Sequence, residues 1–572
     1  MAVENLITEH IDIWTSAVKT RSTSGRGSSK KLELYGVNKL RELILELAVR
    51  GKLVPQDPND EPASVLLERI AAEKAQLVKD GKIKKSKGLG EISEDDRLKN
   101  IPSLWETARL GNLLYVEMGQ SPASKYYNQD HNGVPFFQGK ADFGERYPTA
   151  RYWCVQPQKY AYEGDVLLSV RAPVGPTNIS TEECCIGRGL AALRPISGVP
   201  TNYVYYMMQG FRKTLESFAT GTTFVAVSKV NVENLIISVP PLKEQHRIVD
   251  KVDELMTLCD QLEQQTEASI EAHQVLVTTL LDTLTNSADA NELMQNWARI
   301  SEHFDTLFTT EESIDQLKQT ILQLAVMGKL VPQDPSDEPA AELLKRIAEE
   351  KAQLVKEKKI KKQKALPPIA EDEKPFELPN GWEWCRLPDL GELARGKSKH
   401  RPRNDPKLYE NGNIPLVQTG DVARANGTIL TYTAKYNEFG LAQSQLWPKG
   451  TLCITIAANI ADTATLGFDA CFPDSVVGYT PYDKEIPTVY FDYFIKTAKE
   501  NLERFAPSTA QKNINLEILS NVLVPCPPKQ QFPRIVEKVN LLLGICDELK
   551  ERLKEYQMSQ LHLTDTIVQQ AV

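Results

Sequence analysis

The stretch LAVRGKLVPQDPNDEPA, at Leu47–Ala63, returns as LAVMGKLVPQDPSDEPA at Leu324–Ala340, and this duplication decides the fold. Fifteen of the seventeen positions are identical at an offset of 277 residues, a match that chance does not produce. A repeat of this kind means that the same structural unit is built twice. The sequence therefore predicts a chain of two related halves.

The repeat extends well beyond this stretch. LLERIAAEKAQLVKDGKIKKSK, at Leu66–Lys87, has its counterpart at the same offset, as does Trp105 in Trp382. The block PPLKEQHRIVDKVDELMTLCDQL, which ends at Leu262, matches PPKQQFPRIVEKVNLLLGICDEL, which ends at Leu549, at an offset of 287. The sequences between these blocks diverge. Each half is therefore constant, then variable, then constant.

The constant blocks have the periodicity of amphipathic helices. In the two final blocks apolar residues recur at steps of four and three, which is the a/d pattern of a coiled coil. The first helix could extend to about Leu284, and two equivalent seams of this kind can pack on each other. Pro533 predicts a later helix start in the second copy. The seam residues are Ile248, Val252, Leu255, Cys259 and Leu262, and Ile535, Val539, Leu542, Cys546 and Leu549.

A second pair of helices precedes the quoted stretch. Leu40, Ile44 and Leu47, with their counterparts Leu317, Ile321 and Leu324, share one helical face. The glycines at 51 and 328 are expected to end these helices, because glycine favours the left-handed conformation that follows a helix.

The variable segments contain short β-branched and aromatic runs cut by glycine and proline, which is typical of strands in mixed globules. Examples are Val134–Phe137, Asp165–Val170 and Leu452–Ile456. The predicted fold class is α+β, with two mixed α/β heads separated by long helices that form antiparallel coiled coils in a pseudo-two-fold repeat. The predicted regions are 1–100 (helical), 101–240 (first head), 241–377 (central helices), 378–527 (second head) and 528–572 (final helix).

Composition excludes several classes of protein. The net charge of −9 lies on the helices and linkers, because the first head carries +1 and the second −1. The nine cysteines are scattered without a C-x-x-C pair, so neither a disulfide framework nor a metal site is expected, and a reducing cytoplasm fits best. No apolar run approaches the roughly 18 residues that a membrane span needs. The seven histidines, including His10, His303 and His562, are expected to be surface or satisfied polar residues.

Duplicated helices that separate two unlike globules predict a pseudo-two-fold molecule in which helical pairs hold two binding heads at a set distance. Duplex DNA repeats its grooves every 34 to 36 Å, or about 10 base pairs, which helices of this length can span. The architecture therefore predicts a two-part DNA site with a fixed gap.

The block LRELILELAVRGKLVPQDPNDEPASVLLERI, which begins at Leu40, and the paired Pro-Pro helix starts resemble the specificity (S) subunit of type I restriction–modification enzymes. The resemblance covers nearly the whole chain. It implies that each variable segment is a target recognition domain that reads one half of a split, asymmetric site in double-stranded DNA. It also implies that the conserved helices set the spacer and dock two methyltransferase subunits.

The resemblance further implies that two restriction and translocation subunits join the complex. The chain itself would be a non-catalytic subunit that binds no cofactor. Its partner subunits would use S-adenosylmethionine, for adenine methylation, together with ATP and Mg²⁺.

The second head contains a basic stretch, RGKSKHRPRNDPK at Arg395–Lys407, followed by a strand. Arginine and lysine suit guanine and phosphate, whereas glutamine suits adenine. We predict a DNA-facing loop and strand here, and the alternative is a solvated basic loop. The candidate residues are Lys397, Ser398, Lys399, His400, Arg401, Arg403, Gln418, Thr419 and Arg424.

The first head has a related but weaker signal. The alternative interpretation of its candidate DNA contacts is that the aromatic residues belong to the core and that the remaining residues form an ordinary surface loop. Arg171 could enter a groove or pair with Asp165. The candidate residues are Gln120, Ser121, Lys125, Tyr126, Gln138, Lys140 and Arg171.

Hydroxyl residues near the end of each head, each followed by a lysine, suit phosphate anchoring, and a helix-capping turn is the alternative. These residues are Thr222, Thr223 and Lys229 in the first head and Ser508, Thr509 and Lys512 in the second. The basic stretches at Lys79–Lys87 and Lys356–Lys364 are expected to be solvated ends of helices, and electrostatic steering of the DNA backbone is the alternative.

Gly391–Ser398 satisfies the G-x-x-x-x-G-K-[ST] pattern of a P-loop. A P-loop needs a helix directly after this pattern, and the prolines at 402 and 406 argue against one. A nucleotide-hydrolysing enzyme is therefore disfavoured. A coiled-coil scaffold that binds proteins through both heads remains the other alternative to a DNA-reading subunit.

Overall fold

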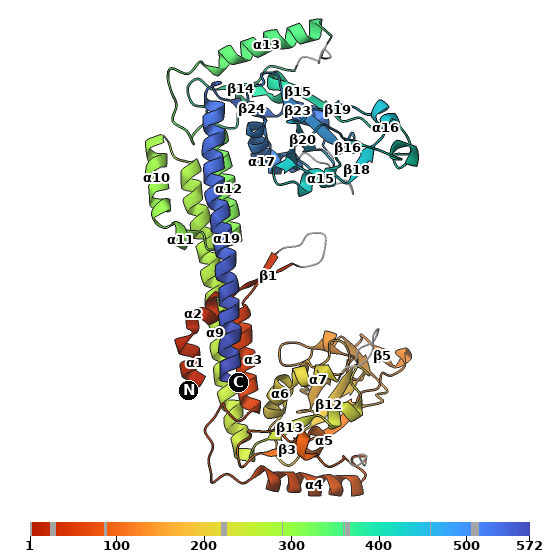
Figure 1. The fold of residues 1–572 in the computed structure, drawn as a ribbon. Helices are drawn as coiled ribbons and strands as arrows, with labels where there is room; N and C mark the ends of the chain where they lie inside the picture. The colour runs from red at the N-terminus through yellow and green to blue at the C-terminus, as the bar shows by residue number, and fades with distance from the viewer. Residues whose placement is uncertain are drawn as a thin grey trace. The chain divides into compact units, whose positions relative to one another are not determined.

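The structure is a computed structural model that describes residues 3–22, 30–84, 89–218, 226–288, 290–358, 360, 366–457, 459–504 and 514–572. The chain divides into two compact units (Figure 1). The first comprises Met1–Ser269 and Tyr556–Val572, and the second comprises Ile270–Glu555. Each unit contains one head and parts of both long helices, so the division follows the sequence repeat.

The first unit contains a pair of short N-terminal helices, a hairpin, and a head between two constant segments. Its helices are α1 (Val3–Glu9), α2 (Ile11–Ser16), α3 (Tyr35–Val49), α4 (Ala63–Lys79), α5 (Leu110–Leu113), α6 (Thr201–Gly210), α7 (Arg212–Ser217), α8 (Lys229–Glu233), the first part of α9 (Leu242–Thr285) and the end of α19 (Gln531–Ala571). Its strands are β1 (Lys19–Ser22), β2 (Lys30–Glu33), β3 (Glu106–Arg109), β4 (Tyr115–Met118), β5 (Tyr127–Asn128), β6 (Val134–Phe137), β7 (Tyr152–Cys154), β8 (Tyr160–Ala161), β9 (Val166–Ser169), β10 (Thr177–Ile179), β11 (Cys184–Ile186), β12 (Leu190–Arg194) and β13 (Ile236–Val239).

The second unit repeats this plan. Its helices are the end of α9, α10 (Ala290–Glu302), α11 (Phe304–Leu307), α12 (Glu311–Val326), α13 (Ala340–Lys356), α14 (Leu387–Leu390), α15 (Thr419–Arg424), α16 (Glu438–Ala442), α17 (Thr488–Arg504), α18 (Leu516–Asn521) and most of α19 (Gln531–Ala571). Its strands are β14 (Glu383–Arg386), β15 (Gly391–Arg395), β16 (Ile414–Leu416), β17 (Thr428–Ile429), β18 (Ala434–Tyr436), β19 (Leu446–Trp447), β20 (Leu452–Thr455), β21 (Thr463–Leu466), β22 (Ala470–Cys471), β23 (Val476–Pro481) and β24 (Leu523–Cys526).

Both heads are mixed α/β globules that share two sheets with four equivalent strands each, and each head adds one strand of its own, β5 in the first and β17 in the second. The first head has sheets of order β10-β9-β12-β4 and β5-β7-β6-β11-β8, and the second has β15-β23-β20-β21-β17 and β18-β16-β22-β19. In each head the first and last strands, β3 with β13 and β14 with β24, pair antiparallel. The strands predicted at Val134–Phe137, Asp165–Val170 and Leu452–Ile456 are confirmed as β6, β9 and β20.

Polar contacts show the relative directions of the long helices in the first unit. The order of the contacts along the chain shows that α3 runs antiparallel to α9 and parallel to α19, so α9 and α19 are antiparallel to each other there. The paired residues are Arg41 with Asp260, Gln56 with Glu244, Tyr35 with Asp565, and Lys52 with the Val572 carbonyl.

The second unit has the same arrangement with the roles of α9 and α19 exchanged. There α12 is antiparallel to α19 and parallel to α9, which again makes the two long helices antiparallel, as predicted. The paired residues are Lys318 with Asp547, Gln333 with Gln531, Gln274 with Glu312, and Lys329 with the Ser287 carbonyl.

The seam residues are buried or half-buried as the a/d pattern requires, but the suggested packing of the two seams on each other was wrong. Each seam lies in a different unit. The α19 seam packs in one cluster with the apolar face of α12 and the end of α9. The short helix fills the seam because its own apolar stripe also has to leave water. The cluster joins Ile535, Val539, Leu542 and Cys546 with Ile314, Leu317 and Ile321 of α12 and Val277, Leu281 and Leu284 of α9.

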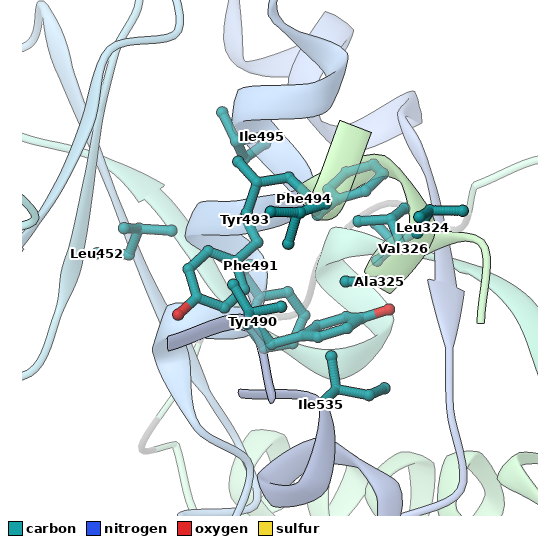
Figure 2. Packing of buried hydrophobic residues seen from close by; sticks show 14 of the residues in the cluster. Leu324, Ala325, Val326, Leu452, Tyr490, Phe491, Tyr493, Phe494, Ile495 and Ile535 are labelled. Atoms are coloured by element: carbon teal, nitrogen blue, oxygen red, sulfur yellow. The ribbon is translucent and has the colours of Figure 1, made fainter. Parts of the chain in front are cut away.

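Helix α17 joins the second head to the helices. Figure 2 shows Tyr490, Phe491 and Phe494 of α17 beside the end of α12 at Leu324–Val326. The hydroxyl of Tyr490 donates to the Pro525 carbonyl at 2.7 Å. Aromatic side chains of this size dominate the burial energy of such a junction. The head and the helices of this unit therefore share one core.

The helix ends agree with the sequence predictions. Helix α9 ends at Thr285, next to the predicted Leu284. Helix α19 begins at Gln531, two positions after the counterpart of Leu242, and holds Pro533 in its first turn, where proline is tolerated. Gly51 and Gly328 follow α3 and α12 with φ of 69° and 71°, which is the left-handed cap conformation.

The repeat also reaches the N-terminal helices, which the sequence analysis missed. ITEHIDIW at Ile7–Trp14 corresponds to ISEHFDTL at Ile300–Leu307, and His10 and His303 each precede the equivalent short helix. The offset there is 293, against 277 further on, so the first copy carries sixteen additional residues. The antiparallel hairpin of β1 and β2 lies in this insertion. It is a feature of the first copy that no periodicity predicted.

Within the described part of the chain, no helix is long and apolar enough to cross a membrane. The same residues contain no cluster of His, Cys, Asp or Glu that could hold a metal ion. All nine cysteines are unpaired and buried.

Candidate nucleic-acid interface

The first head contains a cavity of about 540 Å³. It lies where the chain leaves β4, β6 and β9 and where it turns between β11 and β12, so it gathers residues from four separate places in the sequence. Its lining includes four of the residues predicted from the sequence, namely Ser121, Gln138, Lys140 and Arg171. The other lining residues are Pro122, Tyr127, Phe136, Gly139, Ser169, Ala172, Arg188 and Gly189.

Two glycines shape the floor of this cavity. A Cβ at Gly189 would lie 2.4 Å from the Gln138 carbonyl oxygen, and one at Gly187 would lie 3.1 Å from the Gln138 Cα and 3.3 Å from the Ser121 Oγ. Only glycine permits the approach at position 189, whereas a Cβ at position 187 would require its neighbours to shift by a few tenths of an ångström. The backbone N–H of Arg188, between the two glycines, donates to Ser121 Oγ at 3.2 Å. Arg188 therefore starts from a fixed backbone at the edge of the cavity.

The cations of the first head fall into two groups. Five of its seven arginines have side-chain partners; these are Arg109, Arg146, Arg151, Arg194 and Arg212. In the part of the head that the structure describes, the guanidinium groups of Arg171 and Arg188 form no hydrogen bond or ion pair. The ammonium group of Lys140 forms none there either. All three are exposed and line the cavity. Unpaired positive charge in this head is thus concentrated at one place.

Arg188 and Ser169 were not among the residues predicted from the sequence. The signal that could have found Arg188 is its place in Gly187–Gly189, because an arginine between two glycines on a surface turn is suited to close contact with an anion. Ser169 is buried in β9 and donates to the Arg171 carbonyl at 3.1 Å, so it holds the backbone of a predicted residue.

Gln138 and Gln418 occupy equivalent positions after β6 and β16, as their sequence alignment predicts. The backbone N–H of Gln138 donates to Asp142 at 2.6 Å, and that of Gln418 donates to Asp421 at 2.9 Å. Both aspartates are buried, and both glutamines are exposed. In both heads, the backbone of the exposed glutamine is therefore fixed by a hydrogen bond to a buried aspartate.

The arginine beside each of these aspartates neutralises it. Arg151 donates to Asp142 at 2.8 Å, and Arg424 donates to Asp421 at 2.6 Å. The buried carboxylate raises the pKa of Arg151. Arg424, a predicted DNA contact, is thus engaged within the head.

Three further predicted residues of the first head lie outside the cavity lining. The Lys125 ammonium lies 4.8 Å from the ring centre of Tyr126, and Tyr126 packs against the aromatic cluster of Phe136. The backbone of Gln120 donates to the Ile186 carbonyl at 2.9 Å. The alternative of core aromatics therefore applies to Tyr126.

The suggested pairing of Arg171 with Asp165 was wrong. Asp165 is buried and accepts two hydrogen bonds from Arg194, at 3.0 and 2.8 Å. A buried carboxylate needs a close cation, and Arg194 on the adjacent strand fills that role. Arg171 is left exposed beside the cavity.

The basic loop after β15 in the second head is tied together by its own charges. Arg403 donates to both carboxylate oxygens of Asp474, at 2.6 and 2.8 Å. Arg401 donates to the carbonyls of Ser398 and His400. The hydrogen bond from His400 to Asp405, at 2.8 Å, lowers the pKa of Asp405.

Lysines provide the unpaired charge of this loop. Lys397, Lys399 and Lys407 are exposed, and their ammonium groups have no hydrogen-bond acceptor among the described residues. Ser398 is buried, and Thr419 is half-buried at the first position of α15. The unpaired cations of this loop are thus lysines, whereas those that line the cavity of the first head include two arginines.

Strand registers place Arg188 and Asp474 at equivalent positions. Ala191 pairs with Met118 in the first head, and Val477 pairs with Arg395 in the second. Met118 and Arg395 are separated by the repeat offset, so the residues three positions before Ala191 and Val477 also correspond. The same backbone site carries opposite charges in the two heads.

Of the residues predicted at the ends of the heads, the structure describes only Lys229. Ser228 caps α8 by accepting the N–H of Asn231, and Lys229 forms an ion pair with Glu233 at 3.6 Å. Thr222, Thr223, Ser508, Thr509 and Lys512 lie outside the described residues. The basic stretches begin at Lys79 and Lys356, the last residues of α4 and α13.

The P-loop pattern has the wrong structure for nucleotide binding. Its first five residues, Gly391–Arg395, are strand β15 itself. The described residues from 396 to 405 contain no helix, so no helix N-terminus follows Lys397 to hold a phosphate.

Comparison with known proteins gives consistent results. A family model described as "Type I restriction modification DNA specificity domain" matches residues 102–272 and 379–556. The chain is 43% identical over its full length to the full-length type I restriction enzyme EcoAI specificity subunit of Escherichia coli, and 40% identical, again with full coverage of both, to the EcoEI specificity subunit.

Among solved structures, the HsdS subunit from Thermoanaerobacter tengcongensis is 32% identical, with 44% of this chain and 62% of that chain covered and a TM-score of 0.27. A chain from a study of complex assembly in the type I R-M system is 33% identical, with 46% and 64% covered and a TM-score of 0.29. Both matches span less than two thirds of the solved chain.

Proposed function

This chain belongs to the family of type I restriction modification DNA specificity proteins, and on that basis we propose that it selects the DNA sequence on which a type I restriction–modification complex acts. It is a targeting subunit and not a catalytic one. The observation that carries the proposal is the set of unpaired cations, Lys140, Arg171 and Arg188, gathered around one cavity of the first head. Exposed cations in a concave surface fit the phosphates and base edges of DNA.

The DNA site has two unlike halves. Segment 101–240 is the target recognition domain for one half and segment 378–527 is that for the other. The duplicated sheet plan supports two equivalent docking positions, whereas the different charges around Arg188 and Asp474 support different sequences at the two halves. The conserved regions 1–100, 241–377 and 528–572 set the gap between the halves.

The partners are double-stranded DNA, two methyltransferase subunits and two restriction and translocation subunits. A duplicated framework supports two copies of each partner, because two equivalent surfaces accept the same protein twice. The chemistry belongs to these partners, which use S-adenosylmethionine to methylate adenine and use ATP with Mg²⁺ for restriction.

The test combines the purified chain with its methyltransferase and maps methylated adenines on a library of duplexes. The expected result is a two-part motif with one fixed gap, which disappears when the chain is omitted. Methylation without sequence preference would overturn the proposal in favour of a coiled-coil scaffold. ATP hydrolysis by the isolated chain would instead favour a nucleotide-hydrolysing enzyme.

A further inference from the structure

We propose that Arg171 and Arg188 read guanine in the major groove of the half-site bound by the first head, and that Lys140 holds a neighbouring phosphate. This inference rests on the proposed function and assigns the chemistry of its first head. It makes the two arginines specificity-determining residues and gives Lys140 a positioning role.

In the described part of the chain, the guanidinium groups of Arg171 and Arg188 are unpaired, unlike those of the other arginines in the first head. Every other arginine of the first head is bound to a carboxylate or to backbone carbonyls, whereas these two have no side-chain partner within the described residues. Each guanidinium offers several N–H donors in a planar fork. In the major groove the guanine edge presents two adjacent acceptors, O6 and N7, which match that fork. Guanine is therefore the base edge that best satisfies either arginine.

The backbone that carries Arg171 and Arg188 is rigid. Arg188 is fixed by its N–H bond to Ser121 Oγ and by the close approach of its flanking glycines. The backbone next to Arg171 is fixed because Val170 donates to the Gly189 carbonyl at 2.9 Å. Ser169 Oγ also lies within hydrogen-bond distance of the Arg171 and Pro173 carbonyls, at 3.1 and 2.8 Å, on the two sides of the Arg171–Pro173 turn. Residues that read bases need such a support, since a loose side chain contacts any base equally well.

Lys140 differs from the two arginines in the group of DNA that it suits. Lysine carries a compact charge without a planar fork, so it suits a phosphate more than a base edge. Lys140 follows Gln138, whose exposed amide suits adenine. The cavity therefore joins two guanine readers, one adenine reader and one phosphate contact.

The second head provides an internal control. Its residue at the position of Arg188 is Asp474, which binds Arg403 at 2.6 Å. Changes at Arg171 and Arg188 should therefore leave the half-site of the second head untouched. Retained preference at that half-site also shows that a variant is folded and assembled.

The experiment measures the affinity of the chain with its methyltransferase for duplexes in which each position of the first half-site is changed in turn. Wild type is expected to prefer guanine at one position per arginine by about 10- to 100-fold, the range for a good bidentate contact. Arg171→Gln and Arg188→Gln should each abolish one of these preferences. Arg171→Lys and Arg188→Lys, which keep the charge but lose the fork, should each weaken the same one.

Lys140→Gln gives the contrasting result. The motif should stay unchanged, while the slope of log K against log salt concentration falls by about 0.9, as expected for one lost phosphate contact. Arg212→Gln is the matched control, because Arg212 is an exposed arginine of the same head that is paired with Glu216. It should alter neither the motif nor the slope.

Three outcomes would overturn the inference. If the wild-type motif has no guanine in the first half-site, Arg171 and Arg188 do not read guanine. An unchanged motif with a lower salt slope in the Arg→Gln variants makes the arginines phosphate contacts. If neither the motif nor the salt slope changes in these variants, the cavity does not contact DNA. Failure of the proposed function is distinct, because wild type would then lack sequence preference at both half-sites.

Discussion

Arg188 in the first head and Asp474 in the second stand at the same position of the duplicated fold and carry opposite charges. Arg188 is unpaired at the edge of a cavity. Both carboxylate oxygens of Asp474 accept hydrogen bonds from Nη2 of Arg403, and its backbone carbonyl accepts one from Nε of Arg395. One backbone frame thus supports two different electrostatic surfaces. The difference leads directly to a prediction about the second head.

Asp474→Asn should free Arg403 and remove one negative charge from the basic loop. We expect tighter non-specific binding of duplex DNA, with a slope of log K against log salt concentration steeper by up to about 1. A salt series of binding constants measures this. Glu517→Gln, at an exposed position of α18, is the matched control for loss of one acidic charge. An equal effect in both variants would mean that Arg403 does not meet DNA.

Insertion of seven residues into both α9 and α19 should lengthen the gap between the half-sites. The insertions belong after Ser269 and after Glu555, where each helix passes from one unit to the other. Seven residues add about 10 Å of helix, which corresponds to about three base pairs of DNA. Mapping of methylated sites measures the gap. An unchanged gap in a folded variant would contradict the role of the helices as a spacer.

Leu542 and Leu541 are adjacent on α19 but differ in environment. Leu542 belongs to the core cluster with α12, whereas Leu541 is 59% exposed. Leu542→Ala should lower the free energy of unfolding by about 2–4 kcal/mol, and Leu541→Ala should change it by less than about 0.5 kcal/mol. Denaturant unfolding measures both. Similar losses would show that the helix face is assigned wrongly.

Glu244 and Gln531 are equivalent and accept hydrogen bonds from Trp105 and Trp382 at 2.9 and 3.1 Å. Burial raises the pKa of Glu244. The folded chain therefore holds this proton to a higher pH than the unfolded chain, so the stability contribution present at low pH is lost as pH rises. Glu244→Gln should remove that loss.

The measurement is the free energy of unfolding of wild type and Glu244→Gln from pH 4 to pH 7. The difference between them should grow in favour of the variant as pH rises. Glu244→Ala, which leaves Trp105 without its acceptor, should cost about 1–3 kcal/mol at both ends. Parallel pH profiles for wild type and Glu244→Gln would contradict the prediction.

Burial raises the pKa of Cys259 and of Cys546, at equivalent seam positions, to about 11. Both thiols ionise earlier in the unfolded chain, so the folded state binds more protons between about pH 9 and 11 and its stability falls as pH rises through that range. The double variant Cys259→Ala/Cys546→Ala should show a flatter profile in denaturant unfolding. Equal slopes for the two proteins would place these thiols in a more polar site.

The sequence predicted the framework well because its determinants are local and repeated. The a/d spacing of Ile248 and Ile535, the glycines after α3 and α12, and the β-branched run of β9 each carry their structure in a few neighbouring residues. The partner of each seam could not be predicted, because two seams and two short helices of the same pattern can be matched in more than one way.

The candidate site was predictable only in part, for a different reason. Ser121, Gln138, Lys140 and Arg171 were found by residue type, and the fold brings them to one cavity. Arg188 joins them through the pairing of β11 and β12 with distant strands, which no local pattern encodes. The pairing of Arg403 with Asp474, 71 residues away, was hidden for the same reason.

Each head enters and leaves the framework through one pair of strands, β3 with β13 or β14 with β24. Beside this pair a tryptophan, Trp105 or Trp382, is held by the same contact whichever head follows. A segment whose two ends lie together can be exchanged without rebuilding its surroundings. Recombination between related genes, with crossovers in the conserved flanks, would then transfer a whole reading surface at once. A single exchange of this kind would replace one head and leave the other head and the helices as they were.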